Sequence, residues 1–116
     1  MFKIIFSDID GTLLNAERDL SEYTVETIKN LSKIDIPFIL ISSRMPAAMR
    51  HLQKKLDIEH LPLISYNGGL IIVDGKPVSS TEIPIEILAK LHNFNRIHDV
   101  HLSLFHHDEW YVPRDD

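Results

Sequence analysis

The sequence contains no cysteine, only four glycines and no long hydrophobic run. The absence of cysteine excludes disulfides and thiolate chemistry, and it is compatible with a reducing compartment. No apolar stretch approaches the roughly 20 residues that a membrane-spanning helix needs. The opening MFKIIF is too short for the apolar region of a signal peptide, and acidic residues follow it directly. These absences predict a cytoplasmic protein that does not enter the membrane.

Positive charge is also scarce, because 12 Lys and Arg stand against 17 Asp and Glu, for a net charge of -5. Such a chain is not expected to bind nucleic acid or an anionic membrane. A bound phosphate would need a positive group or a metal ion at its site. The length of 116 residues, 44% of them hydrophobic, allows one domain with a modest core.

Over the first 80 residues, short apolar runs alternate with amphipathic segments. Strands are expected at 3–8, 38–42 and 61–66, the first as a buried strand, and helices at 21–34 and from Pro46 to about 57. This alternation predicts an α/β fold with a parallel, Rossmann-like three-layer core and right-handed crossovers. A hairpin over 70–78 should follow, because Asp74-Gly75 is a strong signal for a two-residue turn.

The pattern changes at residue 81. Residues 83–95 favour a helix with Ile87, Leu91 and Phe94 facing inward, and 100–112 favour an antiparallel hairpin. We therefore expect a division into 1–80 and 81–116. A parallel sheet of three strands, followed by one helix and one hairpin, would be an incomplete structure with unprotected strand edges. The sequence is expected to be the N-terminal part of a longer protein, able to self-associate through open sheet edges.

Asp8 ends the first predicted strand, and a second acid, Asp10, lies two residues later. Ser42 and Asn67 end the second and third strands. Asp8, Ser42 and Asn67 should therefore meet at the carboxyl edge of the sheet, where such folds bind ligands. Turn chemistry explains Asp10-Gly11 but leaves Asp8 unexplained. A magnesium ion would neutralise the acids and attract a phosphate. One acid could then attack phosphorus while the other serves as general acid and base.

The segment DIDGTLL (8–14) resembles the first motif of the haloacid dehalogenase superfamily. The resemblance implies that Asp8 is the nucleophile and a magnesium ligand. It implies that Asp10 is the acid–base group and offers its backbone carbonyl to the metal. Gly11 would let the backbone turn closely around the phosphate, and Thr12 would help to fix the loop.

Two further segments extend the resemblance. ILISSR (39–44) is similar to the second motif, in which Ser42 would bind the phosphoryl group, and Ser43 replaces a glycine common in the closest relatives. Arg44 is equally compatible with a salt bridge at a helix start and with anion recognition. In ISYNGG (64–69), Asn67-Gly68 is expected to be mainly a turn, with substrate contact secondary. These relatives are the Cof-type phosphatases, cytoplasmic enzymes with an α/β cap inserted after the third strand.

By this resemblance, the protein is a magnesium-dependent phosphatase of small phosphorylated metabolites, such as sugar phosphates. The family's third motif, a lysine, and its fourth, an acidic cluster for magnesium, lie beyond the cap and are not in this sequence. The 116 residues alone are therefore expected to be inactive. A phosphomutase of the phosphomannomutase type remains an alternative, as does a non-catalytic phosphate- or metal-binding module. A receiver-like signalling module carries its phosphorylated aspartate at the end of the third strand. Here Tyr66-Asn67 stands at that place, which counts against such a module.

Seven histidines raise the question of a second metal site. His106 and His107 fall in the predicted hairpin loop, where side chains of neighbouring residues are expected to diverge. The sequence therefore does not favour a metal site there.

Overall fold

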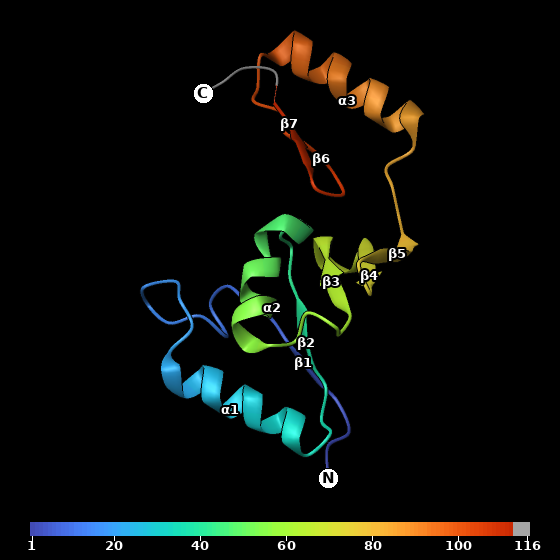
Figure 1. Ribbon diagram of the computed structural model, residues 1–116. Helices are drawn as coiled ribbons and strands as arrows, with labels where there is room; N and C mark the ends of the chain where they lie inside the picture. The colour runs from blue at the N-terminus through green and yellow to red at the C-terminus, as the bar shows by residue number, and fades with distance from the viewer. Residues whose placement is uncertain (113–116) are drawn as a thin grey trace. The chain divides into compact units, whose positions relative to one another are not determined.

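The computed structural model describes residues 1–112 (Figure 1). The chain divides into two compact units, Met1–Ser80 and Thr81–Asp116, with the boundary at the residue where the sequence pattern changes. Residues 113–116, the end of the predicted second part, lie outside the described residues. Within 1–112, no helix combines the length and the apolar character that crossing a bilayer would require.

A five-stranded mixed sheet forms the centre of the first unit (Figure 1). Three strands are parallel, and two antiparallel strands extend the sheet beyond β3, in the order β1-β2-β3-β4-β5. Their bounds are Ile5–Ser7 for β1, Phe38–Ile41 for β2, Leu63–Ser65 for β3, Leu70–Val73 for β4 and Lys76–Ser80 for β5. The predicted α/β class is confirmed, and β4 and β5 make the sheet mixed.

Two helices connect the parallel strands and contact each other. Helix α1, Glu22–Lys33, begins after Ser21, whose hydroxyl accepts a hydrogen bond from the backbone N–H of Thr24 at 3.1 Å. This cap was predicted, because serine satisfies an otherwise unpaired N–H at a helix start. The second helical segment consists of a 3-10 turn η1, Pro46–Ala48, followed by α2, Arg50–Leu56.

The core lies between these helices and one face of the sheet. Leu40 and Leu63 contribute from the strands, Ile28 from α1, and Met49 and Leu56 from the second helical segment. The helical residues follow the predicted three- and four-residue spacing. The neighbouring strand residues, such as Ile39 and Ile64, point to the other face because side chains alternate along a strand.

Strand β1 is not the buried strand that its composition predicts. Among residues 1–112 it lies at the edge of the sheet, and the side chain of Phe6 is 55% exposed. The short run of apolar residues indicated a strand correctly, but the run carries no information on which strands flank it.

The hairpin between β4 and β5 confirms the turn prediction. Asp74 and Gly75 both have positive φ, 51° and 74°, and Val73 pairs with Lys76. A two-residue turn of this kind requires positive φ at both central positions, which aspartate tolerates and glycine favours.

The second unit contains α3, Ile85–His98, and a hairpin of β6, Leu104–His106, and β7, Glu109–Tyr111. Both elements were predicted, but the inward orientation of Ile87, Leu91 and Phe94 is wrong. These side chains are 48%, 40% and 54% exposed, and α3 has no buried residue. Helical periodicity identifies an apolar face, but within the described residues no layer covers this one.

Candidate active site

The loop after β1 places two carboxylates on either side of a buried anchor. Ile9 is fully buried, and its carbonyl accepts hydrogen bonds from the N–H groups of Thr12, Leu13 and Leu14. Asp8 and Asp10 are both exposed. The alternation of acid, isoleucine and acid thus fixes the loop on the core while both acids face solvent.

Gly11 and Thr12 shape the same loop. Gly11 has φ +77°, a conformation that residues with a Cβ rarely adopt, although a Cβ would meet nothing within 4 Å. The glycine is therefore needed for the backbone conformation and not for space. The hydroxyl of Thr12 donates to Oδ2 of Asp8 at 3.3 Å. Thr12 thus orients the Asp8 carboxylate.

The end of β2 is joined to the segment after β3. Ser42 is 3% exposed, its N–H donates to the carbonyl of Ile64 at 3.0 Å, and its carbonyl accepts from the N–H of Asn67 at 2.8 Å. Asn67 and Gly68 have positive φ, 55° and 94°, as the turn interpretation requires. The side chain of Asn67 is exposed, and so is that of Ser43.

Arg44 connects the first loop to the second. Its Nε donates to Oδ2 of Asp10 at 2.8 Å and its Nη2 donates to Oδ1 at 2.7 Å. The guanidinium therefore binds the carboxylate in a bidentate manner. Nη1 donates to the carbonyl of Ala48 at 2.9 Å. Of the two interpretations of Arg44, the structure shows the salt bridge, with Asp10 as the partner. A bidentate fork of this kind also matches phosphate.

The ion pair between Asp10 and Arg44 shifts the pKa values of both groups. The hydrogen bond from Arg44 lowers the pKa of Asp10 below its ordinary value of 3.8, and the charge of Arg18 adds a smaller contribution in the same direction. The hydrogen bond to Asp10 in turn raises the pKa of Arg44. Because the Asp10 side chain is 53% exposed, the pair stabilises the fold by no more than about 1 kcal/mol.

Ser65 holds this arrangement in place, although no motif in the sequence points to it. It is fully buried, and its hydroxyl donates to the carbonyl of Arg44 at 2.6 Å. The N–H of Tyr66 donates to the same carbonyl at 3.2 Å. A serine at the end of an otherwise apolar run was the available signal, since a buried hydroxyl needs a partner.

The structure therefore brings the predicted residues to one edge of the sheet. Hydrogen bonds join Asp10 to Arg44, Arg44 to Ser42, and Ser42 to Asn67. Asp8 lies at the same edge because β1 and β2 pair in parallel, with Ser7 opposite Leu40. Parallel strands direct their carboxyl ends to a common edge, where open α/β sheets bind ligands.

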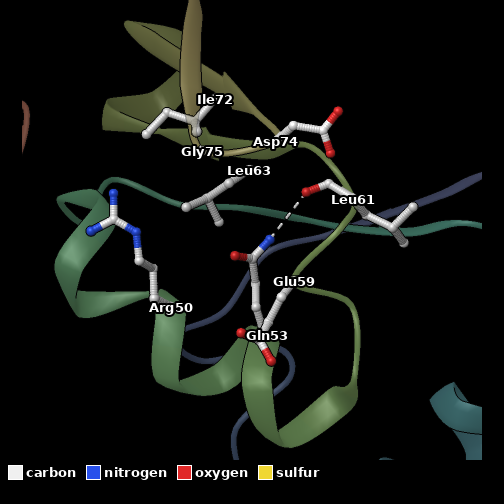
Figure 2. A pocket seen from close by; sticks show the side chains of 8 residues that line it. All are labelled: Arg50, Gln53, Glu59, Leu61, Leu63, Ile72, Asp74 and Gly75. Carbon is white, nitrogen blue, oxygen red and sulfur yellow. Dashed lines mark hydrogen bonds between the residues drawn. The ribbon is translucent and has the colours of Figure 1, made fainter.

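A separate hollow lies toward the amino end of β3 and does not belong to this edge. Figure 2 shows Arg50 and Gln53 from α2 facing Asp74 and Gly75, with Gln53 bonded to the carbonyl of Leu61. Its volume of about 200 Å³ is below the roughly 300–1,000 Å³ of ordinary ligand pockets. We assign it no role in the chemistry.

The ligands that this edge offers suit magnesium in part. Within residues 1–112, Asp8 makes no ion pair, so its exposed carboxylate is accessible to a cation. Neither Asp8 nor Asp10 belongs to a group of three or more metal-ligating side chains in the described residues. One carboxylate with one backbone carbonyl fits a magnesium ion that keeps water and phosphate oxygens as its other ligands.

Comparisons with known proteins identify a family that the chain matches. A family model described as haloacid dehalogenase-like hydrolase matches residues 5–116. Two curated proteins named "Putative phosphatase" are similar in sequence. The one from Buchnera aphidicola is 32% identical over 118 residues, and the one from Haemophilus influenzae is 38% identical over 90 residues. These matches cover 100% and 76% of this chain, but only 44% and 34% of the two relatives.

Solved structures show the same fold. A haloacid dehalogenase-like hydrolase from Bacteroides thetaiotaomicron superposes with a TM-score of 0.89 at 24% identity, covering 98% of this chain and 44% of that one. A protein from Thermotoga maritima superposes with a TM-score of 0.88 at 26% identity, covering 100% and 43%. This chain thus spans less than half the length of the proteins that it matches.

Proposed function

The chain belongs to the haloacid dehalogenase-like hydrolases, and from this premise we propose that it contributes the nucleophile of a phosphatase that acts through an aspartyl phosphate on Asp8. The observation that carries the proposal is the position of Asp8. Its exposed carboxylate follows β1 at the ligand-binding edge, is oriented by Thr12, and has no cationic partner within residues 1–112. A carboxylate so placed is accessible to phosphorus.

The reaction has two displacements. A carboxylate oxygen of Asp8 forms a bond to phosphorus as the bond from phosphorus to the leaving oxygen breaks, and Asp10 gives that oxygen a proton. Asp10 then takes a proton from water, whose oxygen attacks phosphorus and releases inorganic phosphate while Asp8 is regenerated. Acid–base assistance of this kind contributes roughly 10²–10⁴ in rate.

Arg44 must change partner for this cycle to run. In the structure it holds Asp10 in the anionic form, which cannot donate a proton. A phosphate dianion offers the same bidentate acceptor geometry with more charge. We propose that substrate draws Arg44 toward its phosphoryl oxygens, so that the pKa of Asp10 rises when a proton is needed. Arg44 is thereby the local cation that this acidic chain requires.

The remaining residues bind the phosphoryl group and approach the substrate. Two backbone hydrogen bonds hold Ser42 at the edge of the sheet. Its hydroxyl would contact the phosphoryl group, and Gly11, Thr12 and Ser43 would surround the same group. Asn67 and Gly68 lie next along the edge, where the rest of the substrate would pass. Asp8 and the carbonyl of Asp10 would hold magnesium. When bound, that ion neutralises the charge that builds up on the phosphoryl oxygens.

The substrate class belongs to the same proposal, and it rests on the resemblance to the Cof-type phosphatases. We propose small phosphorylated metabolites, such as sugar phosphates, a Cof-type assignment in which residues 81–116 begin the cap, and a cytoplasmic location. A phosphomutase remains the second candidate, because phosphoryl transfer to a second hydroxyl would use the same Asp8 and Asp10. The products separate the two, since a phosphatase releases inorganic phosphate and a mutase returns an isomeric phosphate ester.

Substitution of Asp8 in the native gene product tests the proposal. Asp8→Asn keeps the shape of the side chain and removes the nucleophile, so phosphate release should be lost while the circular dichroism spectrum is retained. Asp74→Asn is the matched control, because the same change there falls in a turn that accepts asparagine. Normal turnover of Asp8→Asn would refute the assignment.

A further inference from the structure

We propose that Glu82, His106 and His107 form a binding site for a transition-metal dication of the Zn²⁺ type. All three residues belong to the second unit. They form the one group of three or more metal-ligating side chains found in the described residues, with one ligand atom of each within 4.8 Å of the others.

The hairpin turn explains how two neighbouring histidines come to face the same point. His106 ends β6, and His107 is the first residue of the two-residue turn. Side chains of adjacent residues in a strand point to opposite faces. His107, however, has φ 52°, and its ring stacks on that of His106 with centroids 4.3 Å apart. The expectation that these side chains diverge is therefore wrong.

Glu82 completes the group from the segment that precedes α3. Its Oε1 lies 3.1 Å from Nε2 of His106 and 3.9 Å from Nε2 of His107. Ligands on a tetrahedral zinc ion, at bond lengths of about 2.0–2.2 Å, are separated by about 3.3–3.6 Å. The two observed separations lie on either side of that value. A small adjustment of these partly exposed side chains would therefore admit an ion from solvent.

The donor atoms determine which ion fits. Two imidazole nitrogens with one carboxylate oxygen suit zinc, copper or nickel, whereas magnesium prefers oxygen ligands in an octahedral arrangement. Three protein ligands would leave a fourth position for water. A bound ion would also tie residue 82 to the β6–β7 hairpin, two segments that are 24 residues apart in sequence.

Calorimetric titration of the full chain with Zn²⁺, in excess Mg²⁺, tests the proposal. We expect one zinc ion per chain. His106→Ala or His107→Ala should abolish this step, and Glu82→Gln should raise the Kd by about tenfold or more, a loss of about 1.4 kcal/mol. His101→Ala is the matched control. It removes an exposed histidine of the same unit whose Nε2 contacts Ser103 and which is not one of the three ligands.

Two further measurements guard against misfolding and adventitious binding. Circular dichroism must show that the variants keep the wild-type spectrum. Co²⁺ replacing Zn²⁺ should give a visible absorption band typical of tetrahedral coordination in the wild type and in His101→Ala, but not in His106→Ala. Absence of zinc binding in the wild type, or equal binding in His106→Ala and His101→Ala, would overturn the proposal.

Discussion

The side chain that most constrains the candidate site is Arg44. It binds Asp10 with two hydrogen bonds, and its backbone carbonyl is held in turn by the buried Ser65. A carboxyl group that is ion-paired with arginine stays deprotonated, so it cannot donate a proton until the ion pair breaks. On the proposed mechanism, Asp10 cannot act as an acid while this pair is intact, and phosphate binding would both recruit the cation and release the acid.

Replacement of Arg44 should raise the pKa of Asp10. Arg44→Gln removes the largest cause of the lowered pKa, whereas Arg18→Gln removes only a minor one. Titration of the Asp10 carboxyl carbon by NMR should show a clear increase in Arg44→Gln and a smaller one in Arg18→Gln. Equal pKa values in the wild type and Arg44→Gln would show that the ion pair is not formed in solution.

The same shift makes a small part of the stability depend on pH. Because folding lowers the pKa of Asp10, the contribution of the pair is present above the unfolded value of about 3.8 and is lost as the pH falls through the lower folded value. The stability difference between the wild type and Arg44→Gln, at most about 1 kcal/mol, should therefore shrink on acidification through that range.

Gly11 gives a second prediction at the scale of one residue. Gly11→Ala forces an alanine to φ +77°. This strain should lower the free energy of unfolding, measured with urea, by about 1–2 kcal/mol. Gly69→Ala is the matched control, since Gly69 has φ -66° and an alanine adopts that backbone conformation readily. Equal stability of the two variants would mean that the loop after β1 relaxes to another conformation.

At the scale of elements, the start of α1 can be tested in isolation. Ser21→Ala removes the acceptor for the N–H of Thr24 and should lower the free energy of unfolding by about 1 kcal/mol. Ser32→Ala, on an exposed position within α1, should be neutral or slightly stabilising, because alanine is the better helix former. A smaller loss in Ser21→Ala than in Ser32→Ala would show that the cap is not formed.

The elements themselves were largely predictable from the sequence. Ser21 identified the start of α1, and Asp74-Gly75 identified the β4–β5 turn, because each depends only on the local backbone. Burial was less predictable. Phe6 on β1 and Leu91 on α3 are exposed although an apolar pattern predicted them to be buried. The spacing of apolar residues shows which residues share a face, but it does not show whether another layer covers that face.

Site residues were predictable in position but not in their pairing. The ends of three apolar runs located Asp8, Ser42 and Asn67 at one edge. The bond between Arg44 and Asp10 spans 34 residues and depends on how the loops fold onto the sheet, so no local pattern contains it. The stacking of His106 on His107 depends on one positive φ, which the sequence HHD does not signal.

At the scale of the whole molecule, one of the two edge strands, β1, bears on assembly. We propose that residues 1–116, expressed alone, self-associate through β1, where unpaired backbone groups and Phe6 are exposed. Phe6→Lys places a charge on that edge and should shift light scattering toward the monomer. Tyr23→Lys makes the same change on the exposed side of α1 and should leave the oligomer intact. A monomeric wild type would contradict this prediction.

Activity of the same 116 residues is a separate question. The family resemblance places a phosphate-binding lysine and further magnesium ligands beyond this sequence. Phosphoryl transfer depends mainly on positioning and charge stabilisation. We therefore expect residues 1–116 alone to hydrolyse an aryl phosphate with magnesium far more slowly than a complete enzyme of this family. Comparable turnover from a monomer would show that the residues at this edge of the sheet are sufficient for catalysis.

The most direct test of the central claim is to identify the phosphorylated residue. The native gene product is mixed with an aryl phosphate and magnesium, quenched in acid, digested and analysed by mass spectrometry. The mechanism predicts a phosphoryl group on Asp8 that hydroxylamine removes, as expected for an acyl phosphate, present in Asp74→Asn and absent in Asp8→Asn. Phosphate on another residue, or undiminished turnover in Asp8→Asn, would contradict the mechanism.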